Sequence, residues 1–207
     1  MLLCCSSEYC SAADEPYAHE YELALLRATR RYNIPPNLLK AISLVESGRY
    51  RRSIGRAEAY PWTICVNGRG SFFTDKLAAV TKIQQLKNQD QRNIDVGVMQ
   101  INLRLYGRHF ASVSEMIDPA KNVDFAARML KRLYNKTKSW RGAVALYHSR
   151  NKKYNIPYTN KVFMALDQMK INAVLAKKPA RVILSSTQDS NDSRAGDNSR
   201  LPSGKQI

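Results

Sequence analysis

One glutamate, Glu46, stands where a helix-forming stretch is expected to end, and that position suits acid catalysis. Apolar residues recur before it at helical spacing, at Leu38, Ala41, Ile42 and Val45. The end of a helix carries partial negative charge and apolar neighbours exclude water, so both disfavour the ionised carboxylate. A carboxylic acid that stays protonated near neutral pH can donate its proton to a leaving group. The pattern therefore predicts a general acid at Glu46, with an ordinary exposed glutamate as the alternative.

The elements around this stretch are predicted to be mostly helical. Pro35 and Pro36 suit the start of the helix that carries Glu46, and Gly48 suits its end. Apolar periodicity and capping residues predict further helices over residues 15–32, 74–88, 118–135, 140–147 and 157–177.

Two segments between Glu46 and residue 74 depart from the helical pattern. The first, residues 49–60, is basic and is expected to be irregular. The second, residues 60–73, alternates apolar and polar side chains around Asn67-Gly68, which predicts a β-hairpin. Because Trp62 and two phenylalanines lie in this hairpin, it is interpreted as one lip of a substrate groove, or otherwise as a surface excursion.

Composition limits the kinds of protein that this chain can be. Its 207 residues, 44% of them hydrophobic, can form one domain with tails, and no run approaches the 18 apolar residues of a transmembrane helix. The net charge of +16 favours a polyanionic partner: nucleic acid, acidic lipid or a wall polymer with carboxylates. Charge alone does not choose among these partners, and no recognised nucleic-acid motif accompanies it, so nucleic-acid binding is supported by charge only.

The chain is divided into three parts by composition. Residues 1–13 are interpreted as a remnant of a secretion signal, or else as a segment that is not a signal, because the basic leading region is missing and the apolar core is short. Residues 14–177 are interpreted as the folded domain and residues 178–207 as a disordered polar tail. Cys4, Cys5, Cys10 and Cys65 do not have metal-ligand spacing, although Cys4 and Cys10 could close a small disulfide. No histidine has a companion at ligand spacing, so neither a metal nor a cofactor is expected.

Three short motifs occur in a telling order: Glu46-Ser47, then Gly97-Val-Met-Gln-Ile-Asn102, then Ala145-Leu-Tyr-His-Ser149. A tyrosine followed four residues later by valine, Tyr158 and Val162, forms a fourth. Together they resemble the soluble lytic transglycosylases, lysozyme-like enzymes that cut the glycan strands of bacterial peptidoglycan. The resemblance implies a mainly α, lysozyme-like helical domain with a small β-hairpin insertion. It also implies a periplasmic or cell-envelope location.

Carried over position by position, the resemblance implies roles for the motif residues. Glu46 would be the sole catalytic acid/base, with Met99 and Gln100 lining the groove beside it. Tyr147 would approach the Glu46 carboxyl and the sugar, and Tyr158 would support the same wall. The full set of expected substrate-binding residues is Ser47, Met99, Gln100, Asn102, Tyr147, His148 and Tyr158.

Two features depart from the plain family pattern. His148-Ser149 replaces the usual Asn-Ala, and Arg150 replaces a glycine, so an amide contact to substrate becomes an imidazole contact or is lost. The segment between Glu46 and Gly97 is also longer than usual. Both features resemble the branch that works with conjugation, type IV secretion or pilus machines. His148 is interpreted as a substrate ligand through a ring nitrogen, or else as a histidine that pairs with carbonyls at a helix end.

The resemblance implies cleavage between N-acetylmuramic acid and N-acetylglucosamine, with formation of a 1,6-anhydro sugar and without water. Hydrolysis by a lysozyme-type muramidase would instead need a second carboxylate. Asp75 is better explained as a helix cap, and Asp95 is favoured as a turn or cap residue, although it could lie near the cleft. An idle peptidoglycan-binding scaffold of a secretion machine is the alternative from a different functional class.

Overall fold

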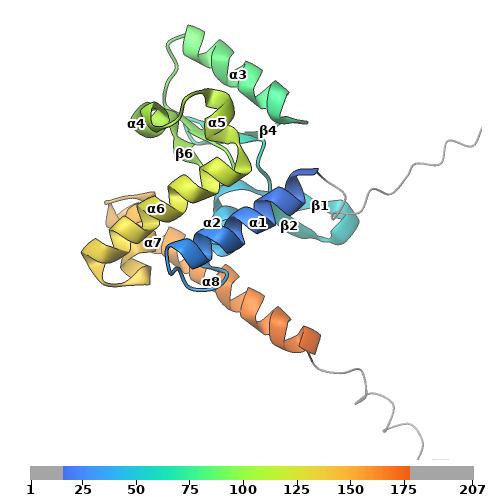
Figure 1. The fold of residues 1–207 in the computed structure, drawn as a ribbon, viewed down its shortest axis with the longest axis vertical. Coiled ribbons are helices and arrows are strands. Elements are labelled where there is room, and N and C mark those ends of the chain that lie inside the picture. Colours follow the sequence, from blue (N-terminus) through green and yellow to red (C-terminus); the bar gives the residue numbers. More distant parts are fainter. Residues whose placement is uncertain (1–15, 178–207) are drawn as a thin grey trace, which may run out of the picture. The chain divides into compact units, whose positions relative to one another are not determined.

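The computed structural model describes residues 16–177, which are mainly helical with two small antiparallel sheets (Figure 1). The elements up to Lys170 belong to one folded unit, and Ile171 begins a second, of which only the end of a helix is described. The proposed signal remnant, residues 1–13, and the proposed polar tail, residues 178–207, lie outside the described residues. None of the described helices is long and apolar enough to cross a membrane.

The helices are α1 (Pro16–Arg31), α2 (Leu38–Ser47), α3 (Lys76–Asn88), α4 (Leu103–Tyr106), α5 (Val113–Ile117), α6 (Pro119–Thr137), α7 (Trp140–His148) and α8 (Lys152–Lys177). Short 3₁₀ turns occur at η1 (Arg52–Ile54) and η2 (Gly107–His109). The strands are β1 (Gly48–Arg51), β2 (Arg56–Ala59), β3 (Thr63–Val66), β4 (Arg69–Phe72), β5 (Ile94–Val96) and β6 (Ile101–Asn102).

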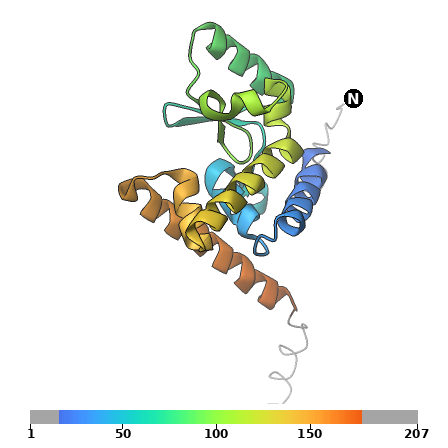
Figure 2. The ribbon, with the colours of Figure 1, turned by 60° about the vertical axis from the view of Figure 1, so that its left-hand side comes forward.

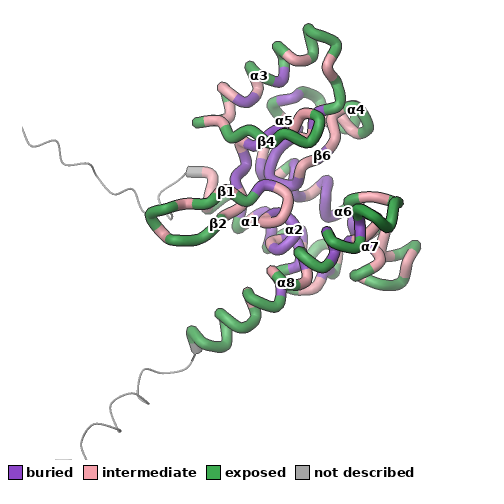
Figure 3. The backbone as a smooth tube through the Cα atoms, turned by 180° about the vertical axis from the view of Figure 1, so that it is seen from behind, coloured by how far each residue is buried: buried purple, intermediate pink, exposed green. Residues whose placement is uncertain are grey.

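Helix α2 lies at the centre of the helical part, and its burial explains why the chain is organised around it. Leu38, Ala41 and Ile42 of the predicted stripe are fully enclosed, while Val45 is partly buried. Helix α6 crosses in front of α2 in Figure 2, with α1 on one side and α7 on the other. The tube in Figure 3 shows the same contrast, since α2 is largely buried and the β1–β2 hairpin is largely exposed. The last turn of α2, which carries Glu46, is thereby partly buried, with Ser47 enclosed and Glu46 at intermediate exposure.

The larger sheet has the strand order β4-β3-β5-β6, and it confirms the predicted hairpin. Asn67 and Gly68 form its turn with φ of 51° and 79°, the left-handed pair that a two-residue hairpin loop requires. In the register, Cys65 faces Asp95 and Asp95 faces Asn102, so these three side chains share one face of the sheet. The other face carries Ile64 and its neighbours and is buried in the core.

The structure corrects the expectation of an irregular segment after Glu46. Residues 48–59 form a second antiparallel hairpin, β1–β2, in which Gly48 pairs with Ala59 and Arg51 with Arg56. An ion pair between Arg51 and Glu58, at 3.6 Å, joins the two strands. The hairpin was missed because, apart from the exposed Tyr50, its strands carry only charged or small residues, so no apolar alternation marks them.

Two predicted helices also differ in detail. Helix α8 begins at Lys152 rather than at Pro157, which lies inside it, because Asn151 accepts a hydrogen bond from the Lys153 amide and starts the helix earlier. In α3, the apolar Leu77 is 75% exposed, whereas Ala79 and Ile83 are buried. Periodicity assigns the face of a helix, but only its packing decides where that face ends.

A tight turn over residues 97–100 connects β5 to β6 and is held by one buried side chain. Asn122 of α6 accepts from the Met99 amide at 2.8 Å and donates to the carbonyls of Val96 and Met116 at 3.0 and 2.8 Å. Gly97 has φ of 82°, and a Cβ there would lie 2.8 Å from the Asn122 side chain. The position therefore needs glycine both for its backbone conformation and for space.

We predict that Asn122→Ala destabilises the domain by about 3 kcal/mol, because it leaves buried backbone groups without partners. Urea unfolding monitored by circular dichroism measures the change. Asn135→Ala is the matched control, because Asn135 is an exposed residue of the same helix. Equal effects of the two substitutions would contradict a structural role for the Asn122 amide.

Candidate active site

Glu46 lies in the last turn of α2 and is held by a phenol from another helix. The hydroxyl of Tyr158, on α8, donates a hydrogen bond of 2.6 Å to Glu46 Oε1. Burial raises the pKa of Glu46 to about 7; the Tyr158 hydrogen bond lowers it, and the negative charge of Asp95 adds to the rise. The direction agrees with the sequence-based prediction, and a large fraction of Glu46 is protonated at neutral pH.

The two tyrosines of the site differ in the hydrogen bonds that they make. Tyr147 was expected to approach the Glu46 carboxyl, but its hydroxyl donates to the Met99 carbonyl at 2.8 Å. Burial raises the pKa of Tyr147, and the negative charge of Glu46 raises it further. Tyr147 therefore lies near enough to Glu46 for the two groups to interact electrostatically. Tyr158, expected only to support the wall, makes the direct contact with the acid.

Ser47 and Met99 are buried and do not line the exposed part of the site. The Ser47 hydroxyl lies 2.9 Å from the Val98 carbonyl and 3.0 Å from the Ser43 carbonyl, and the Tyr60 amide donates to the Ser47 carbonyl at 3.1 Å. Ser47 is 2% exposed and Met99 is fully enclosed. The Ser47 side chain therefore fastens the end of α2 to the turn over residues 97–100, and neither side chain is open to a sugar in this structure.

Gln100 and Asn102 are partly buried, and their side-chain amides form hydrogen bonds with different groups of the protein. The Gln100 side-chain nitrogen donates to the Gly97 carbonyl at 2.7 Å and to the Thr63 carbonyl at 3.2 Å. Asn102 caps α4 by accepting from the Leu105 amide. Its nitrogen donates to the side chains of Asn93 and Asp95 at 3.0 and 2.9 Å. Both residues hold the backbone and the Asp95 carboxylate in place, which differs from direct binding of substrate.

Asp95 and Asp75, the two other carboxylates considered, have different surroundings. Asp75 is exposed and caps α3 by accepting from the Ala78 amide at 2.8 Å, as the sequence favoured. Asp95 is partly buried, and burial raises its pKa, although the hydrogen bond from Asn102 opposes the rise. Its charge acts on Glu46, Tyr147 and His148, so Asp95 faces the site rather than a remote turn.

His148 ends α7 and lies flat against Tyr158. The two ring centroids are 4.2 Å apart and the ring planes differ by 7°. Burial lowers the pKa of His148, Asp95 opposes that shift, and Lys161 adds to it. The neutral imidazole is therefore the main form at neutral pH.

Among residues 16–177, no three histidine, cysteine, aspartate or glutamate side chains lie where they could hold a metal ion together. Cys65 is a free, partly buried thiol on the same sheet face as Asp95.

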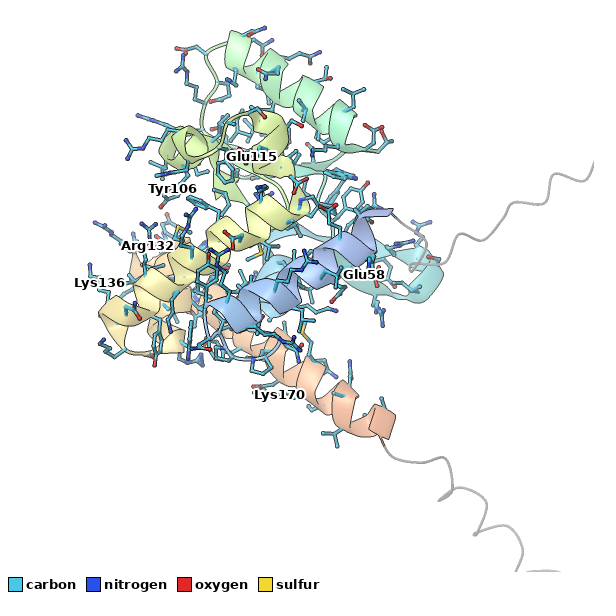
Figure 4. The ribbon with its side chains drawn as sticks, in the orientation of Figure 1. Glu58, Tyr106, Glu115, Arg132, Lys136 and Lys170 are labelled. Atoms are coloured by element: carbon cyan, nitrogen blue, oxygen red, sulfur yellow. The ribbon has the colours of Figure 1, made fainter. Side chains whose placement is uncertain are left out.

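The basic surplus is concentrated on the helices after residue 126. Between Ala126 and Leu166 there are ten lysines or arginines and no aspartate or glutamate. Arg132 and Lys136 project from α6 into solvent (Figure 4). Lys131 lies over the stacked rings of Tyr134 and Trp140, 5.0 and 5.6 Å from their centroids. This side of the molecule suits an anionic polymer.

Comparison with known proteins decides the family. A family model described as the transglycosylase SLT domain matches residues 24–156. The chain belongs to this family. No curated protein and no solved structure matches it. Members of the family are lytic transglycosylases, so an SLT domain indicates peptidoglycan as the substrate and a location outside the cytoplasm.

The SLT match contains Glu46, the turn over residues 97–100, Tyr147 and His148, and it ends two residues before Tyr158. The phenol that contacts the acid therefore lies outside the matched region. Sequence reasoning also did not single out Asn122, which positions the turn. The pattern that could have found it is a polar residue on an apolar stripe, since Asn122 lies four residues before the buried Ala126.

Because its pKa is raised in the folded state, Glu46 should make stability depend on pH. The unfolded chain releases this proton near the ordinary glutamate pKa of 4.5 and the folded chain near 7, so ionisation costs stability as pH rises through that window. Glu46→Gln, whose amide oxygen can still accept from Tyr158, should remove this loss.

We predict that wild type loses up to about 3 kcal/mol more stability than Glu46→Gln between about pH 4.5 and about pH 8.5. Urea unfolding at both pH values measures the difference. Glu20→Gln, at an exposed position of α1, controls for the loss of one surface charge. Parallel pH dependence in wild type and Glu46→Gln would show that the Glu46 pKa is not raised.

Proposed function

We propose that the protein is a lytic transglycosylase that cleaves the β-1,4 bond between N-acetylmuramic acid and N-acetylglucosamine, with Glu46 as its only acid/base. The observation that carries the proposal is a carboxyl of pKa about 7 at the end of α2, hydrogen-bonded by Tyr158. A group with this pKa can give up a proton in one step and take one up in the next at the same pH.

The reaction needs no second enzymic carboxylate. Protonated Glu46 donates to the glycosidic oxygen, the C1–O bond breaks, and the N-acetylglucosamine side leaves with a new hydroxyl. The 2-acetamido oxygen of the muramoyl residue stabilises the positive charge at C1. Ionised Glu46 then takes the proton of the muramoyl C6 hydroxyl, whose oxygen bonds to C1. The ring closure is intramolecular, so proximity replaces a bound nucleophile, and Glu46 ends protonated as it began.

Tyr158 tunes both halves of this cycle. Its hydroxyl donates to Glu46 Oε1, which stabilises the carboxylate that acts as base and moderates the rise in pKa that burial causes. The phenol itself stays protonated, because burial and the Glu46 charge raise its pKa well above the usual range. Tyr158 therefore acts as a permanent donor that fixes one oxygen and leaves the other for the sugar.

Hydrolysis by a muramidase is the second candidate, and the position of Asp95 favours it. Its partly buried carboxylate acts electrostatically on Glu46 and could activate a water molecule, as the second carboxylate of an inverting glycosidase does. Asn102 already donates to one Asp95 oxygen, which keeps that oxygen engaged. The anhydro route remains our proposal, because it needs only the one acid.

We further propose a periplasmic enzyme that opens the wall locally for an envelope machine of the conjugation, type IV secretion or pilus type. Two sequence features support this role: His148-Ser149-Arg150 at the third motif, and the long segment between Glu46 and Gly97. In the structure that segment contains the β1–β2 and β3–β4 hairpins and α3. A catalytically idle wall-binding scaffold would keep these features and lose activity on sacculi.

Digestion of purified sacculi tests the reaction. Wild type should release muropeptides with 1,6-anhydromuramoyl ends, identified by mass spectrometry, and Glu46→Gln should lower the rate by about 10³-fold or more while remaining folded. Wild-type-like release by Glu46→Gln would refute the assignment, and no release by wild type would favour the scaffold.

Asp95→Asn separates lyase from hydrolase. Because the anhydro route assigns no chemical step to Asp95, the variant should still produce anhydro ends. Reducing muramic acid ends from wild type, together with their loss in Asp95→Asn, would establish the muramidase instead.

A further inference from the structure

His148 contacts the catalytic arrangement through the face of its ring. The imidazole is nearly parallel to the Tyr158 phenol, with 4.2 Å between centroids, and the phenol donates to Glu46 Oε1 at 2.6 Å. The three side chains come from α7, α8 and α2. His148 stacks on Tyr158, and Tyr158 in turn forms a hydrogen bond with the acid.

The backbone of α8 is less well held next to Tyr158, so a contact with the Tyr158 ring helps to fix its position. Pro157 lies directly before Tyr158 inside α8 and has no amide hydrogen, so the helix lacks one of its internal hydrogen bonds there. Asn155, which is 7% exposed, donates to the Ser149 carbonyl at 3.0 Å and so adds a hydrogen bond between α8 and the residue that follows α7. Asn155 thereby fixes the residue after His148 relative to the turn of α8 that carries Tyr158, and sets the two rings face to face.

The electrostatics of His148 suit packing better than binding through a charge. Burial and Lys161, on α8, lower its pKa, whereas Asp95, on β5, raises it. The neutral ring that results adds no positive charge beside Glu46, so it leaves the proton affinity of the acid to burial and to Tyr158. Aromatic rings in such contact hold one another in a preferred geometry.

We propose that His148 is a positioning residue whose ring face holds the Tyr158 phenol, and through it the Glu46 carboxyl, whose other oxygen carries the proton for the sugar. As a contributor to catalysis the inference rests on the proposed function, but the positioning itself does not. It replaces the expected contact between a ring nitrogen of His148 and the substrate, which would use the edge of the ring.

Two substitutions distinguish the face of the ring from its nitrogens. His148→Phe keeps a flat ring and removes both nitrogens, whereas His148→Asn keeps a polar N–H and removes the ring. If stacking matters, His148→Asn should lower kcat on sacculi by about tenfold or more with little change in KM, and His148→Phe should recover most of that loss. His19→Asn, at an exposed position of α1, is the control for the same chemical change elsewhere.

The pH profile supplies a readout that a general loss of packing would not move. The Tyr158 hydrogen bond lowers the pKa of Glu46, so loosening the phenol should raise it. The alkaline limb of the kcat profile should therefore move up by about one pH unit in His148→Asn, and return toward the wild-type position in His148→Phe.

Activity in His148→Asn with loss in His148→Phe would overturn the proposal in favour of a nitrogen contact with substrate. Full activity and unshifted profiles in both variants would overturn it as well. If both variants are inactive, comparing the pH dependence of unfolding of each variant with and without Glu46→Gln reports the Glu46 pKa. A rise in His148→Asn alone supports the proposal, and any other result overturns it.

The unfolding measurement also separates this inference from the proposed function. It needs no substrate, so it decides whether His148 positions Tyr158 even if wild type releases no muropeptides. In that case the enzyme assignment fails and the structural role of the stack is still tested.

Discussion

The structure depends on keeping the Glu46 carboxyl group poorly solvated while giving it one hydrogen-bond donor. Burial at the end of α2 favours the protonated form of Glu46, while the Tyr158 hydrogen bond favours the ionised form. The two effects leave the pKa at about 7. A fully solvated glutamate would stay ionised, and a buried one without a donor would stay protonated, so neither could alternate between acid and base.

That balance requires rigid surroundings for Glu46. The protein provides them mainly through side chains that form hydrogen bonds with the main chain of a single turn. Ser47 from α2, Asn122 from α6 and Tyr147 from α7 each bond to a main-chain group within residues 96–99. Buried polar groups that are all satisfied hold one geometry, because moving any of them leaves a donor or acceptor unpaired. Several motif residues therefore serve the site by fastening elements to this turn rather than by touching a sugar.

Tyr158 is positioned by aromatic packing and a contact between helices rather than by a hydrogen bond to the turn. Tyr158 is located by the stack with His148 and by the Asn155 contact between α7 and α8, at a point where Pro157 weakens the helix itself. The family match stops at Ile156, so this support comes partly from beyond the matched region. Aromatic packing and a neutral imidazole thus stand where the plain family pattern has an amide.

The sequence by itself determined the mainly helical fold and the β3–β4 hairpin, because these follow from local periodicity and turn residues. It also predicted the direction in which the pKa of Glu46 shifts, although the burial, the Tyr158 hydrogen bond and the Asp95 charge that set this pKa come from the packing. It did not reveal the β1–β2 hairpin, whose strands lack apolar alternation, or the start of α8 before Pro157. Only the tertiary structure decided that Tyr158 rather than Tyr147 contacts the acid, that Ser47 and Met99 are enclosed, and that Asp95 faces the site. Which side chain meets which depends on how α7, α8 and the sheet pack against α2, and contacts between residues up to 112 positions apart leave no local pattern.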